Sequence, residues 1–208
     1  MKVLGLCCSP RKNGNTEILV TEALAGAQEA GAETELVSVA GKELMPCDAC
    51  DACLKTFKCH IKDDMQSILD KLLQADGIII GSPTWNQSVT NQAASLVTRI
   101  SRVLPSKLLA NKVGAPIAVA SRTGTWDVIV RLYLFFLSQH MFCADYVSGL
   151  ARNRGRVRND ERSMRESKEL GKQVVALVNQ RLKWPEGYER SFYGQLAERY
   201  GYKLNPFD

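Results

Sequence analysis

The sequence predicts an α/β protein built on a doubly wound, five-stranded parallel sheet, with a C-terminal arm. Two observations carry this prediction. Short apolar segments alternate with longer amphipathic ones, which is the pattern of repeated βαβ units. The first of these segments, residues 2–7, is also nearly continuous in apolar residues, as a strand covered by helices on both faces should be, whereas residues 34–39 alternate and are expected nearer the sheet edge.

The alternation predicts five strands and five helices in chain order. The strands span residues 2–7, 34–39, 77–82, 114–120 and 141–147. The helices span residues 16–30, 92–104, 127–140 and 160–181, with a further helix opening at Asp63 and Asp64. Asn15 or Thr16 can cap the first helix, and Gly31 closes it. Segment 77–82 is the most apolar and is expected at the centre of the sheet.

The chain of 208 residues fits one domain with an arm. We expect the domain at residues 1–183 and the arm at residues 184–208, where aromatic residues and prolines become frequent. A short helix at residues 192–200 is predicted within the arm. Aromatic residues in such numbers are expected to pack on the domain or on a partner subunit.

Composition excludes several classes of protein. No segment reaches the ~20 apolar residues of a membrane span, and no signal-peptide pattern is recognised, so a cytoplasmic protein that does not bind membranes is expected. Seven cysteines in that compartment favour metal or redox chemistry over disulfides. The net charge of +5 comes from arginines clustered in residues 152–165, which lack stacking aromatics, so no nucleic-acid partner is expected.

The loop after the first strand has the features of an anion site. It offers Ser9, Arg11, Asn13, Asn15 and Thr16 at the start of a helix, where backbone N–H groups and the helix dipole favour negative charge. The loop lacks the glycines of a Walker motif or of a dinucleotide fingerprint. An ordinary polar turn with a capping asparagine is the alternative interpretation.

This loop resembles that of the flavodoxin-like NADPH-dependent FMN reductase family, which has the form Ser-x-Arg-x-x-x-x-Thr. A second loop, residues 81–86, is similar to that family's second flavin loop. The resemblance covers about residues 1 to 180 and implies strand order 2-1-3-4-5. It implies that the residues of the first loop hold the FMN phosphate. The residues that it implies beside the flavin ring are Pro83, Thr84, Trp85 and Asn86.

A third flavin loop is expected after the fourth strand, with Ser121, Thr123 and Gly124 as its candidate residues. Family members commonly have a Gly-Gly pair here, whereas this chain has one glycine and a bulky Trp126. All three loops leave the carboxyl ends of strands, where ligands bind in open α/β sheets. Trp85 has the alternative role of a packing or interface residue.

Four cysteines after the second strand form the most specific motif of the chain. Cys47, Cys50, Cys53 and Cys59 have the spacing C-x2-C-x2-C-x5-C within a loop at residues 46–62. Four thiolates so close together repel one another unless a metal centre neutralises them, and thiolates are the usual ligands of [4Fe–4S] clusters. Zinc and a redox disulfide are the alternatives. We expect this loop and the anion loop to lie side by side at one rim of the sheet.

The motif resembles that of the iron–sulfur flavoproteins, a branch of the same family. The resemblance implies an electron-transfer flavoprotein with FMN and a [4Fe–4S] cluster, with NAD(P)H as a candidate substrate. It also implies a homodimer or homotetramer, and the arginine-rich segment is a candidate surface for an acidic electron carrier such as ferredoxin. The cofactors supply the chemistry, so no catalytic side chain is predicted.

Two other functions remain open. One is an NAD(P)H-dependent FMN or quinone reductase whose cysteine loop holds zinc or free thiols. The other is a non-enzymatic module that binds zinc and nucleic acid, which predicts colourless protein and salt-dependent binding.

Overall fold

The structure is a computed structural model that describes residues 1–56, 58–103 and 108–185. Its elements, in chain order, are β1 (Lys2–Cys7), α1 (Asn15–Glu29), β2 (Glu33–Ser38), α2 (Cys53–Thr56), α3 (Met65–Gln74), β3 (Gly77–Pro83), α4 (Asn91–Val103), β4 (Val113–Ala120), α5 (Thr125–Ser138), β5 (Phe142–Cys143), β6 (Val147–Leu150), a 3₁₀ helix (Arg156–Asn159) and α6 (Glu161–Asn179). No helix within those residues is long and apolar enough to cross a membrane.

The strands form one parallel sheet in the order β2-β1-β3-β4-β5, with β6 also paired to β4. This confirms the predicted fold class and strand order. The predicted fifth strand is divided into β5 and β6. Between them, Ala144 N still donates to Gly114 O of β4 at 2.9 Å, and side chains add two further hydrogen bonds. Tyr133 Oη donates to Ala144 O at 3.0 Å, and Gln173 Oε1 accepts from Asp145 N at 3.3 Å.

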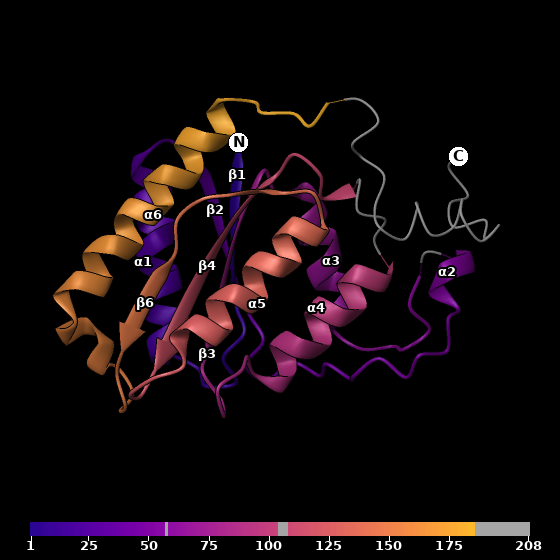
Figure 1. Ribbon diagram of the computed structural model, residues 1–208, viewed down its shortest axis with the longest axis horizontal. Helices are drawn as coiled ribbons and strands as arrows, with labels where there is room; N and C mark the ends of the chain where they lie inside the picture. The colour runs from indigo at the N-terminus through magenta and orange to yellow at the C-terminus, as the bar shows by residue number, and fades with distance from the viewer. Residues whose placement is uncertain (57, 104–107, 186–208) are drawn as a thin grey trace.

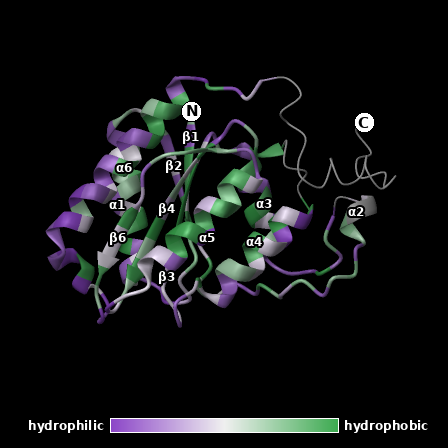
Figure 2. Ribbon diagram, viewed as in Figure 1, coloured by the Kyte–Doolittle hydropathy of each residue, from purple (hydrophilic) through white to green (hydrophobic). Residues whose placement is uncertain are grey.

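Helices cover both faces of the sheet (Figure 1), so its central strands β1, β3 and β4 are buried on both sides. Leu4, Leu6 and Ile80 belong to the core under α3, α4 and α5. Val3 and Ile79 point the other way, into the core under α1 and α6. This alternation is why the central strands β1, β3 and β4 are hydrophobic along nearly their whole length (Figure 2), whereas the edge strand β2 carries several polar residues.

Helices α1 and α6 cross in direct backbone contact. A Cβ atom on Gly26 would lie 1.9 Å from the carbonyl oxygen of Lys168, and one on Gly171 would lie 1.8 Å from that of Ala23. Each distance is far shorter than any non-bonded contact that a Cβ atom makes. The absence of both side chains therefore sets how closely α6 lies on α1.

Most of the C-terminal arm, including the predicted helix at 192–200, lies outside the described residues. Its first part is described and packs on the domain. Trp184 Nε1 donates to the carbonyl oxygen of His140 at 2.9 Å, and its ring stacks on Phe142 with centroids 5.2 Å apart. The boundary at residue 183 stays a prediction.

Candidate functional site

The carboxyl ends of β1 and β3 are tied together at the point where the chain reverses its direction of winding. Cys8 N donates to Gly81 O at 2.7 Å, and Thr90 Oγ1 donates to Cys8 O at 2.8 Å. The loops after β1 and β3 therefore start side by side. This is the place where open α/β sheets bind their ligands.

The loop after β1 forms a concave cradle in front of α1. Gly14 is the N-cap residue, in place of the expected Asn15 or Thr16, and no side chain caps the helix. A Cβ on Gly14 would lie 3.1 Å from Arg11 O and 3.5 Å from Ser9 Oγ, so a side chain here would fill the cradle. The first amides of α1 are thus left for an anion, and the cradle fits a phosphate group.

Asn15 points away from this cradle. Its Nδ2 atom donates to Asn153 O at 2.9 Å and to Ala151 O at 3.2 Å, and its Oδ1 atom accepts from Val157 N at 3.3 Å. Asn15 therefore anchors the arginine-rich segment instead of facing the phosphate position as expected. The exposed side chains of Arg152 and Arg154 consequently belong to the same rim as the cradle.

The loop after β3 closes into a tight turn. Trp85 and Ser88 exchange backbone hydrogen bonds of 2.8 and 3.0 Å, and the two residues between them, Asn86 and Gln87, both have positive φ. Asparagine adopts a positive φ at little cost. Two consecutive residues with positive φ form a turn that is typical of β-hairpins. The Trp85 side chain is 43% exposed. Its ring is therefore available to cover a planar ligand.

The loop after β4 lies against the turn after β3. Thr84 Oγ1 donates to Gly124 O at 3.2 Å, and a Cβ on Gly124 would lie 2.3 Å from Gln87 Oε1. Gly124 also has a φ of 92°, a backbone conformation that favours glycine. The bulky Trp126 packs outside this contact, with its ring centroid 4.8 Å from that of Tyr146.

Ser121 and Thr123 lie exposed on the loop after β4, and Pro83 ends β3. The three loops expected around a flavin thus meet at one edge of the sheet. The side chain of Thr16 is buried in the same region, with its methyl group 2.9 Å from the Cβ position of Gly81. Asn13 has a φ of 52° and its backbone N–H donates to Glu17.

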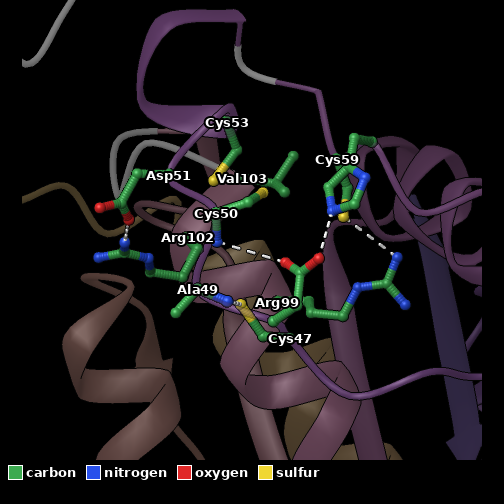
Figure 3. Close-up of a pocket in the computed structure, with 11 residues that line it drawn as sticks. Cys47, Ala49, Cys50, Asp51, Cys53, Cys59, Arg99, Arg102 and Val103 are labelled. Atoms are coloured by element: carbon green, nitrogen blue, oxygen red, sulfur yellow. Dashed lines mark hydrogen bonds and ion pairs between the residues drawn. The ribbon is translucent and has the colours of Figure 1, made fainter.

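The cysteine loop forms a separate pocket, and all four candidate ligands line it (Figure 3). Cys53 begins the short helix α2 and is buried, whereas Cys50 is exposed. Cys47 Sγ accepts a hydrogen bond from Ala49 N at 3.4 Å. Burial raises the pKa of Cys53, although nearby Arg102 opposes this effect. The structure therefore brings the four predicted residues to one site.

The two ends of the cysteine loop are joined to each other by hydrogen bonds between protein groups. Glu43 N donates to Asp64 Oδ2 at 2.8 Å, and Asp64 N donates to Glu43 O at 3.1 Å. Met45 N donates to Asp63 Oδ2 at 2.9 Å. Residues 43–45 and 63–64 thus form a stem, and the stem closes the loop that carries the cysteines.

Sequence reasoning missed two arginines of α4 that line this pocket. Arg99 is 1% exposed, donates to Cys59 Sγ at 3.2 Å and pairs with Asp63. Arg102 pairs with Asp51 on the opposite side of the pocket (Figure 3). Burial tends to raise the pKa of Asp63, but the hydrogen bonds from Arg99 and from two backbone amides lower it overall. Arg99 follows Leu96 by three positions and therefore lies on the apolar face of α4. A charged residue on that face was the sequence signal that could have identified it.

A second set of potential ligands overlaps the cysteine pocket. Ligand atoms of Asp48, Cys50 and His60 lie within 4.8 Å of one another. His60 Nε2 and Asp48 Oδ2 are 2.7 Å apart, so these two side chains already hydrogen-bond each other. Hydrogen bonding to Cys50, assisted by His60, lowers the pKa of Asp48.

The cysteine pocket does not adjoin the flavin edge, contrary to expectation. It lies against Arg99, Arg102 and Val103 in the last part of α4, whereas the start of α4 follows the loop after β3. With a rise of about 1.5 Å per residue, Asn91 and Arg99 are separated by about 12 Å along the helix. The two candidate sites therefore lie toward opposite ends of α4, whose course Figure 1 shows.

The three remaining cysteines do not line the cysteine pocket. Cys7 and Cys8 are fully buried at the end of β1, and burial raises the pKa of Cys7 to about 12. Cys143 is half-buried in β5, where burial raises its pKa to about 11. These thiols behave as small apolar side chains, as the sequence indicated.

The fold, the anion cradle and the loops at the sheet edge define a flavin-dependent oxidoreductase. Residues 1–150 match the profile of the NADPH-dependent FMN reductase family, and the chain belongs to that family. Among curated relatives it is similar to an iron–sulfur flavoprotein of Methanocaldococcus jannaschii, with 40% identity over 86% of this chain and 97% of that protein. Another, from Methanosarcina thermophila, is 42% identical over 63% of this chain and 70% of its own length.

Solved structures agree with this fold. A flavone reductase has a TM-score of 0.72 and 20% identity, over 86% of this chain and 63% of its own. An archaeal flavodoxin has a TM-score of 0.54 and 16% identity, over 86% of this chain and 99% of its own. These similarities establish the flavodoxin-like fold, and the sequence relatives establish the iron–sulfur flavoprotein branch.

Proposed function

We propose that the protein is an electron-transfer flavoprotein that holds FMN at the sheet edge and a [4Fe–4S] cluster on Cys47, Cys50, Cys53 and Cys59. The observation that carries the proposal is the pocket lined by all four cysteines of one loop, whose two ends are hydrogen-bonded to each other. Its physiological role is to pass electrons between a reduced carrier and an acceptor. FMN exchanges electrons singly or in pairs, and an iron–sulfur cluster exchanges them one at a time. Together they can therefore connect a two-electron partner with a one-electron partner.

The spread of the cysteines supports a cluster over zinc. Sulfur ligands about 2.3 Å from a tetrahedral zinc ion lie about 3.8 Å from one another. Among the residues that the structure describes, three ligand atoms within 4.8 Å come from Asp48, Cys50 and His60, and not from three of the cysteines. The C-x2-C-x2-C spacing is also tighter than the paired spacing of zinc ribbons, which supports a cube of iron and sulfide over a single ion.

The roles of the flavin residues follow from their positions. Ser9, Arg11, Asn13 and Thr16 would hold the phosphate with the first amides of α1, and Asn15 would stabilise the cradle from behind. The residues that would line the ring are Pro83, Thr84, Trp85, Asn86, Ser121, Thr123 and Gly124. The exposed Trp85 would exclude water from one face. We assign no proton transfer to any side chain, and NAD(P)H remains a candidate electron donor.

Partners are part of the proposal. Along α5 the exposed apolar side chains of Trp126, Val130, Leu134 and Leu137 form a stripe, and Figure 2 shows this helix as mostly hydrophobic. We propose that a second copy of the chain covers the stripe, in a homodimer or homotetramer. Because the two sites lie toward opposite ends of α4 within one chain, assembly would offer a shorter route between them. The rim with Arg152 and Arg154 suits an acidic carrier such as ferredoxin.

The decisive experiment is anaerobic purification followed by metal and flavin analysis. The proposal expects one FMN, with iron and acid-labile sulfide in equal amounts, and loss of both inorganic components in Cys47→Ser. Zinc without sulfide would favour a flavin reductase with a structural metal. Protein without flavin absorbance would contradict the proposal as a whole. Reduction by NADPH, NADH or reduced ferredoxin in the same cuvette would then identify the donor.

A further inference from the structure

Arg99 is a buried cation that no part of the flavin site requires. It lies in the middle of α4 with a side chain that is 1% exposed. A buried charge is costly unless it is paired and hydrogen-bonded, so its position needs a specific explanation. The residues that it contacts all belong to the loop that carries the cysteines.

The guanidinium group joins both ends of that loop to one of its cysteines. Nη1 donates to Met45 O at 3.0 Å and to the carboxylate of Asp63. Nη2 donates to Asp63 Oδ1 at 3.1 Å, to Cys59 Sγ at 3.2 Å and to Ile61 O at 3.5 Å. Only a planar fork with several donors can make these contacts at once, and a lysine ammonium cannot.

Cys59 is the cysteine that needs such an anchor most. The other three are two residues apart, whereas five residues separate Cys59 from Cys53. The pairing at the stem fixes Asp63, and Arg99 transmits that position to the sulfur of Cys59. The Nη2–H group of Arg99 that donates to Cys59 Sγ also places positive charge beside that sulfur. A hydrogen-bond donor at a ligand sulfur stabilises the more negatively charged, reduced state of a metal centre.

We propose that Arg99 is a positioning residue of the cysteine site, which seats Cys59 and raises the reduction potential of the centre that the four cysteines hold. The inference rests on the proposed function, since it concerns the centre assigned there. A purely structural role for Arg99 would consist of its ion pair with Asp63 alone. For a substitution of Arg99, such a role predicts a lower free energy of unfolding and an unchanged reduction potential of the metal centre.

The test compares Arg99→Lys with Arg102→Lys, one turn further along α4. Both variants keep the positive charge, but only the first loses the donor to Cys59 Sγ. Both proteins are reconstituted anaerobically with iron and sulfide. FMN content and thermal unfolding report on folding, and the midpoint potential of the centre is measured by titration followed with electron paramagnetic resonance.

We expect Arg99→Lys to keep its FMN, to release iron to a chelator roughly tenfold faster than wild type, and to be harder to reduce. A tenfold change in the reduction equilibrium is about 59 mV for one electron. Arg102→Lys should match wild type in potential. An unchanged potential and iron retention in Arg99→Lys would overturn the inference while leaving the proposed function intact.

Two further outcomes are also decisive. If Arg99→Lys fails to bind FMN, the double variant Arg99→Gln, Asp63→Asn removes both buried charges together and leaves neither unpaired. A wild-type potential in that variant would overturn the inference, and a more negative one would support it. If wild-type protein takes up no iron or sulfide, the inference and the proposed function are both wrong.

Discussion

Asn15 of α1 donates from its side-chain amide to the backbone carbonyl oxygen of Asn153 at 2.9 Å. This bond joins the loop after β1 to the arginine-rich segment, which is more than 130 residues away in the chain. The cradle at the sheet edge therefore depends on a segment that local sequence does not connect to it.

Asn15→Ala should weaken FMN binding by about tenfold, because it removes hydrogen bonds worth about 0.5–1.5 kcal/mol each that hold the cradle. Fluorescence titration of the apoprotein with FMN measures the effect. The matched control is Asn153→Ala, which keeps the backbone carbonyl that Asn15 uses. Equal weakening in both variants would show that the anchor has no special role.

Gly171→Ala should lower the free energy of unfolding by about 1–3 kcal/mol or more, since overpacking forces α6 away from α1. The new Cβ would lie 1.8 Å from the carbonyl oxygen of Ala23. Denaturant unfolding of this variant is compared with that of Arg165→Ala, an exposed change in the same helix. A stable Gly171→Ala protein would mean that the two helices are less tightly packed than described.

Asp160 should make stability depend on pH. Its carboxylate caps α6 by accepting from Ser163 N at 3.1 Å, and Leu150 N donates to it at 3.2 Å. Burial raises the pKa of Asp160, but these amides lower it overall. A lowered pKa stabilises the fold above the usual carboxyl pKa of about 3.9, and this contribution is lost as the pH falls through the lower value in the folded state.

Asp160→Ala should therefore cost about 1 kcal/mol at pH 7 and progressively less in acid. Asn is itself a good capping residue, so Asp160→Asn should retain most of the stability at pH 7 while losing the pH dependence. Unfolding in urea between pH 7 and pH 3 measures both effects. A constant difference between wild type and Asp160→Ala across that range would contradict the assignment.

Removal of iron with a chelator should leave FMN bound. The flavin edge and the cysteine pocket lie at opposite ends of α4, and the loop stem is closed by hydrogen bonds that need no metal. Flavin absorbance after gel filtration of the treated protein is the measurement, with Cys50→Ser as a preparation that lacks iron from the start. Release of flavin together with iron would show that the two sites are coupled.

Leu134→Glu should dissociate the proposed oligomer, because it places a charge in the middle of the exposed apolar stripe of α5. The side chain of Leu134 is 57% exposed in the single chain. Arg131→Glu, on the same helix but outside the stripe, is the control. Light scattering gives the mass of each variant, and an unchanged mass for Leu134→Glu would place the interface elsewhere.

Much of the fold could be predicted because hydrophobic patterning is local. The alternation of strands with helices and the cysteine loop after β2 agree with the sequence analysis, and the strand order is the one that the family resemblance implied. The division of the last strand could not be predicted. The residues between β5 and β6 also hydrogen-bond to Tyr133 and Gln173, which lie in two helices, and no local pattern specifies those contacts.

The candidate site was predictable where spacing alone defines it. Four cysteines in thirteen residues with short spacers can reach one centre when the loop wraps around it, and the structure gathers them in one pocket. Arg99 and Asn15 show the opposite case. What each side chain contacts is decided by the segment that folds over it, residues 45–63 for one and residues 151–157 for the other. Their roles emerge only in three dimensions.

The hydrogen-bonded stem at Glu43 and Asp64 makes the intervening segment a self-contained insertion. The chain enters and leaves it at adjacent points, so excising the insertion would require only a short new connection. The cysteine pocket is thus an addition to the sheet and its helices, joined to them through the contacts of Arg99. Loss of the insertion would therefore require a second change, because it would leave the buried charge of Arg99 without the partners that the inserted residues supply.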